Sequence, residues 1–262
     1  MYEYRICCFI DILGFKNHLD ETLKDDGNDS IKKIEEIKGV IDLANSILKE
    51  MDNGIFKSKM VTQFSDSIVL SFRIEEKSGV FYALIDFLHV SLEFANKGFL
   101  TRGGIAVGKL IHTNKHIFGP ALVEAYNLES KIARFPRIIL HPDVLGVAKY
   151  FPSSHNSSTD ELESVHTCLS KDDDGYYYID YIGKVVSELD DNNYGLIDYL
   201  NGLKKTILKS MKSDDSNIND KIDWLRKKYN NYILSIQSNI KDWKDIDGDY
   251  ELLMEFRSLH TI

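Results

Sequence analysis

The chain is poor in cysteine and proline. Only three of its 262 residues are cysteines and only four are prolines. Cys7 and Cys8 are adjacent, and neighbouring residues of a strand point to opposite faces, so the two are poor disulfide partners and form no metal-ligand pattern. We therefore expect the cysteines to be small packing residues of a protein in a reducing, cytoplasmic setting.

Long apolar runs are also missing. No uninterrupted stretch approaches the roughly 18 apolar residues that a membrane-spanning helix needs. The opening segment MYEYRICCFI has no basic lead, long apolar stretch or small-residue cleavage site, so it does not resemble a signal peptide. We expect no association with a membrane.

Positive charge is in deficit, because the formal net charge is -9 at pH 7. A general nucleic-acid binder needs a basic face to neutralise phosphates, so we expect no nucleic acid as a partner. A small anionic substrate remains compatible with this charge if a bound cation and a few local basic groups offset it. The 43% apolar content is enough for a substantial core in one large domain.

Strand-like and helix-like patterns alternate along the first part of the chain. In order, they are a strand over 4–12, a helix over 31–51, a hairpin of 60–64 and 67–72, a helix over 80–96, a strand over 100–112, a helix over 120–132 and a strand over 136–140. This order predicts an α+β sandwich, with a mostly antiparallel sheet and helices over one face.

The last part of the chain is helical by pattern, over 194–211 and again over 219–240. We expect these helices to pack as a hairpin on the core or on a partner subunit. The chain is therefore divided into a domain over 1–185 and a helical C-terminal extension over 186–262.

Two aspartates stand in positions that call for an explanation. Asp11, in FIDILGF, ends a buried strand, where an unpaired carboxylate is costly and needs a cation, hydrogen-bond donors or water. Asp66, in FSDSIV, lies at the tip of the predicted hairpin, where an aspartate is by itself an ordinary turn residue. If the fold brings them together, the two carboxylates are suited to share one or two hard divalent ions.

The backbone next to Asp11 offers further groups. The Ile12 carbonyl is a candidate metal ligand, and the N–H groups of Leu13, Gly14 and Phe15 are candidate phosphate donors where the chain enters a helix. Sequence spacing alone does not prove that these groups and Asp66 meet.

Four sequence blocks together resemble the class III nucleotidyl cyclases. They are FIDILGF around Asp11, FSDSIVLSF around Asp66, RGGIAVG over 102–108 and GPALVEAYNLE over 119–129. They occur in the family's order, within residues 4–140. The resemblance implies a ferredoxin-like cyclase fold and a homodimer with active sites at the subunit interface.

The same resemblance implies a reaction and a metal site. The metal ligands would be Asp11, the Ile12 carbonyl and Asp66, both aspartates would be catalytic, and two Mn²⁺ or Mg²⁺ ions would be bound in each site. The ribose 3′ oxygen of a nucleoside triphosphate would attack the α-phosphorus, giving a 3′,5′-cyclic nucleotide and pyrophosphate.

The chain departs from the purine cyclases at the residues that read the base. Thr62 stands where they typically have a lysine, and His116 where they have an aspartate. Val123 and Asn127 replace the asparagine and arginine that position the ribose and stabilise the transition state. The site is therefore either inactive or built for a different base.

The segment over 125–138, AYNLES followed by PRI, favours a different base. It resembles the pyrimidine cyclases of the bacterial Pycsar anti-phage systems, which make cyclic UMP or cyclic CMP with manganese. This resemblance implies a uridylate or cytidylate cyclase whose cyclic nucleotide is bound by a separate downstream effector protein. Uridylate is favoured only because it is commoner in that family.

Replacement roles can be assigned only as candidates. Thr62 and His116 are candidates for reading the base, although a histidine in the position of His116 is more often a plain surface residue. Arg102 and Lys109 are candidates for contacting phosphate, although solvent-facing charges explain them equally simply. Two other functions stay open. One is an unusual adenylate or guanylate cyclase, and the other an inactive nucleotide-binding module that regulates a partner.

Overall fold

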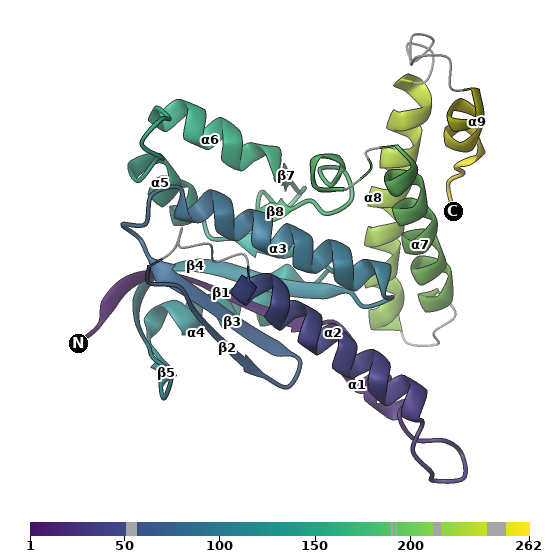
Figure 1. Cartoon of the computed structure of the whole chain (residues 1–262), viewed down its shortest axis with the longest axis horizontal. Helices are drawn as coiled ribbons and strands as arrows, with labels where there is room; N and C mark the ends of the chain where they lie inside the picture. The colour runs from purple at the N-terminus through teal and green to yellow at the C-terminus, as the bar shows by residue number, and fades with distance from the viewer. Residues whose placement is uncertain (51–56, 190, 192, 212–215, 240–249) are drawn as a thin grey trace. The chain divides into compact units, whose positions relative to one another are not determined.

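The computed structural model describes the chain except for residues 51–56, 190, 192, 212–215 and 240–249 (Figure 1). It forms two compact units, Met1–Ile179 and Asp180–Ile262. None of the helices in the described part is both long and apolar enough to span a membrane.

The first unit is built on one sheet, whose described strands follow the order β2-β3-β1-β4-β6-β8-β7, with β5 paired to β4. The strands are β1 (Glu3–Ile12), β2 (Met60–Phe64), β3 (Ser67–Arg73), β4 (Thr101–His112), β5 (Ile117–Phe118), β6 (Ile138–Leu140), β7 (Leu169–Lys171) and β8 (Tyr177–Ile179). Neighbouring strands pair antiparallel except β4 and β6, which are parallel. The predicted α+β class with a mostly antiparallel sheet is confirmed.

Helices connect these strands. They are α1 (Phe15–Asp20), α2 (Ile31–Glu50), α3 (Gly79–Asn96), α4 (Pro120–Asn127), the π-helical turn η1 (Leu128–Ala133), α5 (Asp143–Tyr150) and α6 (Ser158–Thr167). The helix patterns that start near residues 31, 80 and 120 are confirmed. The end that we expected for the first of them, Met51, lies outside the described residues.

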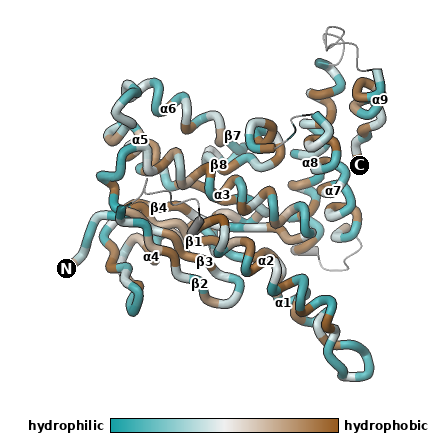
Figure 2. Tube along the Cα trace, viewed as in Figure 1, coloured by the Kyte–Doolittle hydropathy of each residue, from teal (hydrophilic) through white to brown (hydrophobic). Residues whose placement is uncertain are grey.

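The two faces of the sheet differ in their cover. On β1 the even-numbered side chains from Ile6 to Ile12 point to one face, the α3 face, where Phe72 of β3 lies against the start of α3 at Gly79. Figure 1 shows α3 on one side of the sheet and α4 on the other, and Figure 2 shows the apolar residues that line α3 and the central strands. The covering of the sheet by α2 and α3 makes this face the main core of the first unit.

The odd-numbered side chains of β1, from Arg5 to Asp11, point to the opposite face, the α4 face. There α4 lies so close to β4 that a Cβ on Gly104 would be 2.5 Å from the carbonyl oxygen of Ala125. Only a glycine allows this approach of helix and strand. The α4 helix and η1 cover only part of this face, since Phe9 and Thr62 stay partly exposed.

The second unit is helical, with η2 (Val186–Glu188), α7 (Tyr194–Ser210), α8 (Ser216–Asn239) and α9 (Tyr250–Ser258). Leu203 of α7 and Ile233 of α8 are fully buried. The buried hydroxyl of Tyr199 donates to the carbonyl oxygen of Tyr181 at 2.6 Å. The expected helices are present, and the end expected at Ile240 lies outside the described residues. Packing of this unit on a partner subunit stays a prediction, as do the functional domain limits 1–185 and 186–262.

Candidate active site

The structure brings Asp11 and Asp66 into contact. Asp66 is the second residue of the two-residue turn between β2 and β3, and Ser65 before it has φ 55°, the positive value that tight hairpin turns require. Because β3 pairs with β1 up to Ile10 and Ile68, this turn lies beside the end of β1. The two side chains are close enough that Asp66, through hydrogen bonding and charge, raises the pKa of Asp11. The hairpin and the strand end thus meet as the metal-site prediction requires.

The environment of Asp11 disfavours a second negative charge. Burial, the hydrogen bond and charge of Asp66 and the charge of Glu129 raise the pKa of Asp11 to about 8, against a smaller lowering by Arg102. The Asp11 side chain is 23% exposed. Two converging carboxylates short of positive charge suit a hard divalent cation, which binds carboxylate oxygens and would relieve their repulsion.

The protein side chains supply only part of a metal-ligand set. Within the described residues, no group of three or more His, Cys, Asp or Glu side chains is arranged to hold a metal. A cation bound by Asp11 and Asp66 would therefore need further oxygens from the backbone or from a phosphate. The Ile12 carbonyl, at the end of β1, stays a predicted ligand of this kind.

Arg102 lies between Asp11 and Glu129. Its Nη2 is 3.8 Å from Asp11 Oδ2, and its Nε donates to Glu129 Oε1 at 2.6 Å. Glu129, in η1, is 2% exposed. Because Asp11 and Arg102 are directly opposed on β1 and β4, the strand register itself places this cation beside the aspartate. The role of Arg102 toward phosphate stays a prediction.

The backbone after Asp11 corrects one expectation. The N–H of Leu13 donates to the carbonyl oxygen of Leu100 at 2.8 Å, continuing the pairing of β1 with β4. Leu13 therefore has no N–H to offer to a phosphate. Gly14, with φ 73°, then turns the chain into α1. The N–H groups of Gly14 and Phe15 stay predicted phosphate donors.

Lys109 is the second correction. It pairs with Tyr4 in the even-numbered register of β1, so its side chain belongs to the α3 face, opposite to Asp11. It also lies seven residues beyond Arg102 on β4, which corresponds to about 23 Å along a strand. Within one chain, Lys109 does not reach the aspartate pair.

The two candidate base-reading residues, Thr62 and His116, make no contact with each other among the contacts that the structure describes. His116 is exposed in the turn between β4 and β5, where its N–H donates to Thr113 Oγ1 at 3.0 Å. Thr62 on β2 instead contacts His112, with 2.8 Å between Oγ1 and Nε2. His112 was not among the residues predicted from the sequence. Alternation along β4 places it on the same face as Arg102, but the pairing that brings β4 near β2 is not visible in local sequence.

His112 belongs to a buried chain of polar groups. Its Nδ1 is 2.8 Å from Ser71 Oγ, and Ser71 Oγ accepts from Arg5 Nε at 2.9 Å. Arg5, Ser71 and His112 are 2%, 0% and 5% exposed. Burial and the nearby Arg5 charge lower the pKa of His112 to about 4, so its ring is neutral at pH 7.

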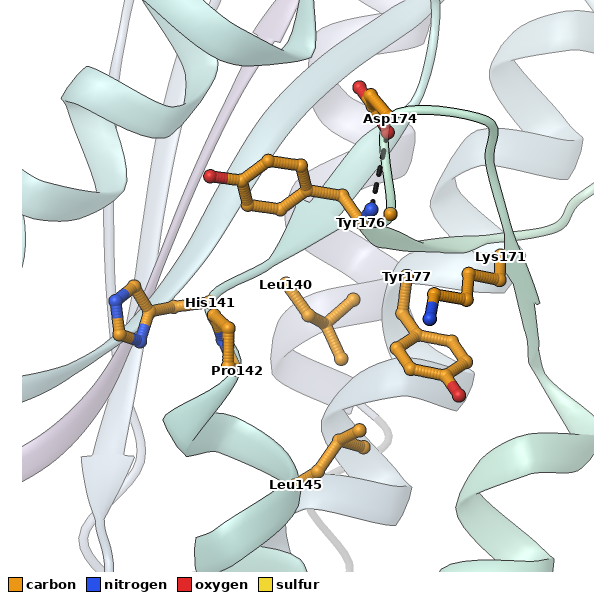
Figure 3. A pocket seen from close by; sticks show the side chains of 9 residues that line it. Leu140, His141, Pro142, Leu145, Lys171, Asp174, Tyr176 and Tyr177 are labelled. Atoms are coloured by element: carbon orange, nitrogen blue, oxygen red, sulfur yellow. Dashed lines mark hydrogen bonds between the residues drawn. The ribbon is translucent and has the colours of Figure 1, made fainter.

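A cavity of about 400 Å³ lies elsewhere on the first unit, between the end of β6 and the β7–β8 hairpin (Figure 3). It is lined by Leu140, His141, Pro142, Leu145, Lys171, Asp174, Gly175, Tyr176 and Tyr177. Asp174 is held there by Arg137, at 2.5 Å, and accepts the Tyr176 N–H at 3.2 Å. None of the predicted site residues lines this cavity, so it is separate from the aspartate pair.

Comparison with known proteins gives similarity in structure only. Neither the protein-family models nor the curated proteins contain a match. Solved structures similar to this chain include the adenylyl cyclase CyaB from P. aeruginosa, at 13% identity and a TM-score of 0.47, over 68% of this chain and 94% of that one. A bacterial light-regulated adenylyl cyclase has 15% identity and a TM-score of 0.43, over 79% and 99% of the two chains.

A third similar structure is the catalytic core of a rhodopsin-guanylyl cyclase with converted specificity, in complex with ATPαS. Its identity is 14% and its TM-score 0.43, over 68% of this chain and 95% of that one. At such low identity and TM-score, the function has to be argued from the side chains of the site.

Proposed function

We propose that the chain is a metal-dependent nucleotide cyclase that converts a pyrimidine nucleoside triphosphate, UTP or CTP, into the 3′,5′-cyclic nucleotide and pyrophosphate. One observation carries the proposal. Asp11 and Asp66 are far apart in sequence, and the β1–β3 pairing joins their carboxyl groups at one edge of the sheet. Two of the four sequence blocks that resemble class III cyclases contain these aspartates.

In this proposal Asp11, Asp66 and the Ile12 carbonyl hold Mn²⁺ or Mg²⁺. The ions would neutralise charge on the triphosphate and on the attacking oxygen. The bond that forms joins the ribose 3′ oxygen to the α-phosphorus, the bond between the α-phosphorus and its bridging oxygen to the β-phosphorus breaks, and the 3′ hydroxyl proton is released. Arg102, with the N–H groups of Gly14 and Phe15, would orient the phosphates.

The choice of a pyrimidine is supported by the residues present at the base-reading positions. Thr62 is smaller than the lysine of purine cyclases, and it bonds to His112 rather than to an acidic partner. The resemblance of residues 125–138 to Pycsar cyclases supports the same choice. It also supports a role as the source of a second messenger in bacterial antiviral defence, with a separate effector protein that binds the product.

A homodimer with shared active sites is part of the proposal. Large apolar side chains remain exposed on or beside the α4 face, including Phe64 at 82%, Val123 at 59% and Tyr126 at 50%. Large apolar side chains exposed on one face are often covered in a protein interface. A second copy placed against this face would also enclose the aspartate pair.

The test is direct. Pure protein is incubated with each of the four ribonucleoside triphosphates and Mn²⁺, and the products are separated by chromatography. We expect a cyclic pyrimidine nucleotide, with the rate reduced on the order of 10³-fold in Asp66→Asn, the upper range for loss of one preorganised electrostatic group. The matched control is Asp26→Asn, which changes an exposed turn aspartate of the same type.

The other outcomes separate the alternatives. Cyclic AMP or cyclic GMP as the main product would replace the pyrimidine assignment with a purine cyclase. Binding of nucleotide without turnover, at all four bases and with both metals, would favour a regulatory module. Equal loss of activity in the Asp26→Asn control would remove the argument for the pair.

A further inference from the structure

The cavity beside β6 lies on the face of the sheet opposite to the aspartate pair. Leu140 of β6 is paired with Ile105 of β4, whose side chain is on the α3 face, so Leu140 is on that face too. The register from β6 through β8 to β7 places Tyr177 and Lys171 on the same face. The cavity that these residues line is therefore separate from Asp11, which points to the α4 face.

The walls of this cavity are mostly apolar and aromatic. Leu140, Pro142 and Leu145 supply aliphatic surface, and Tyr176 and Tyr177 supply two rings (Figure 3). The volume of about 400 Å³ is at the small end of the range for ligand pockets, about 300–1,000 Å³, and suits a molecule of one or two fused rings. A flat aromatic molecule buries apolar area in such a space and finds tyrosine rings to pack against.

The carboxylate and the imidazole of the lining already have partners in the chain. Arg137, which is 0% exposed, bonds to both oxygens of Asp174, at 2.5 Å and 3.3 Å. The same guanidinium bonds to Asp172 at 2.5 Å, so it fixes the turn between β7 and β8. His141 Nδ1 accepts the N–H of Asp143 at 3.3 Å. The negative charge of Asp174 is thus neutralised within the protein, and this wall of the cavity is formed in advance.

Lys171 differs from the other polar residues of the lining. Its ammonium lies over the ring of Tyr177, with 5.5 Å from Nζ to the ring centroid, and it pairs with no carboxylate among the described residues. An ammonium has three N–H donors, and its attraction to a ring at an exposed position is weak. An acidic group on a ligand would supply the charged partner that the chain does not.

We propose that this cavity binds a small aromatic molecule that carries one acidic group. The ring packs between the aliphatic wall and Tyr177, and the acidic group bonds to Lys171. A cationic ligand is disfavoured, because Asp174 is already paired with Arg137 and because Lys171 would repel a second cation. The inference is independent of the proposed function, since none of the residues of the aspartate pair takes part in it.

The first experiment compares three probes that share one ring system and differ in charge. They are 2-naphthoate, its uncharged amide and 2-naphthylmethylammonium, and each is titrated against the full chain at pH 7 by ligand-observed NMR. We expect 2-naphthoate to bind with a Kd of about 1 mM or below, as for a ligand of about a dozen non-hydrogen atoms. It should bind about tenfold more tightly than the amide, the value of one hydrogen bond to a charged group. Equal binding of the three probes, or tightest binding of the cation, would overturn the proposal.

The second experiment removes the charge of Lys171. Lys171→Gln keeps a hydrogen-bonding side chain, so it should weaken the binding of 2-naphthoate about tenfold and leave the binding of the amide unchanged. The matched control is Lys149→Gln, which changes an exposed lysine of α5 that does not line the cavity and should alter neither affinity. An equal loss in the two variants would reflect the net charge of the protein and contradict the pairing with Lys171.

The third experiment locates the probe. Leu145→Trp places a larger ring at a half-buried position of the lining and should abolish the binding of 2-naphthoate, with urea denaturation showing that the variant is folded. If 2-naphthoate bound this variant as tightly as the unaltered protein, it would lie outside the cavity and the proposal would be wrong. If the variant did not fold, the comparison of Lys171→Gln with Lys149→Gln would still decide.

Discussion

Two aspartates on opposite faces of the same sheet have opposite surroundings. Asp86, on the α3 face, is 3% exposed and pairs with Lys59, whose Nζ is 2.8 Å from its carboxylate. Asp11, on the α4 face, lies beside a second carboxylate, Asp66, and the neighbouring Arg102 is closer to Glu129 than to Asp11. One carboxylate is neutralised by the chain, and the other is left short of positive charge.

This difference separates a structural from a functional carboxylate. A buried charge that only serves the fold needs a partner from the chain itself, because burial without one is costly. A pair of like charges at the edge of a sheet has no structural advantage. The aspartate pair is therefore explained by something that the chain binds, whereas the Lys59–Asp86 pair is explained by the chain alone.

The largest effect on stability is expected at Asp86, which pairs with Lys59. Asp86→Ala leaves the Lys59 ammonium buried without its carboxylate, so we expect the free energy of unfolding to fall by about 3–5 kcal/mol. Urea denaturation followed by circular dichroism measures it. Asp42→Ala, an exposed aspartate on α2, is the control and should change stability by less than about 0.5 kcal/mol.

A double variant sharpens this result. Replacing both partners, as Lys59→Met with Asp86→Leu, removes the two charges together and should recover most of the loss. If the double variant were as unstable as Asp86→Ala, the loss would come from packing and not from an unpaired ammonium.

A smaller effect is expected at His112, and only in acid. Its pKa is lowered from 6.5 to about 4 in the folded protein, so between these values the unfolded chain binds a proton that the folded chain does not. Stability therefore rises with pH through this window, and it is lost as the pH falls from 6.5 toward 4. His112→Gln lacks this contribution.

The measurement compares urea midpoints of the unaltered protein and His112→Gln from pH 7.5 to pH 4.5. We expect the advantage of the unaltered protein to be constant above the ordinary histidine pKa and to shrink below it. A constant difference over the whole range would mean that the buried chain through Ser71 and Arg5 does not hold the ring neutral.

Local sequence was sufficient for the long strands and helices, although not for α1, β5, α6 or β7, and for the unusual position of Asp11. The mostly apolar run in 4–12 reflects a strand buried on both faces, and the helical spacing after residue 31 reflects a helix buried on one face, so each segment records its own burial. Asp11 was identified because a carboxylate at the end of a buried strand needs a partner. The meeting with Asp66 came only from a family resemblance, since pairing of β1 with β3 depends on residues about sixty positions apart.

The remaining site assignments differ in what local sequence could decide. Lys109 is seven residues from Arg102 in the same predicted strand, so alternation alone places the two side chains on opposite faces, and the register with β1 agrees. His116 attracted attention by its place in the motif, whereas His112, four residues earlier, contacts Thr62. The contact of His112 with Thr62 joins residues fifty positions apart, which no local pattern records.

The smallest effect is expected at Asp66, with the opposite sign to Asp86. In metal-free protein at a pH above the Asp11 pKa of about 8, Asp66→Asn removes one of two like charges and keeps the hydrogen-bonding shape, so we expect stability to rise by up to about 1 kcal/mol. Urea denaturation in the presence of a chelator measures it, with Asp26→Asn as the control for an exposed turn aspartate.

Adding Mn²⁺ should make the unaltered protein more stable than Asp66→Asn. An ion that binds only the folded state stabilises it by an amount that grows with the logarithm of its concentration over Kd. The unaltered protein should gain stability with Mn²⁺, and Asp66→Asn should gain much less. If Asp66→Asn instead lost several kcal/mol without metal, as Asp86→Ala is expected to, the two aspartates would be alike and the pair at the sheet edge would be structural. A gain in stability that is abolished by metal would identify repulsion between Asp11 and Asp66 as the cost of keeping a site ready for a cation.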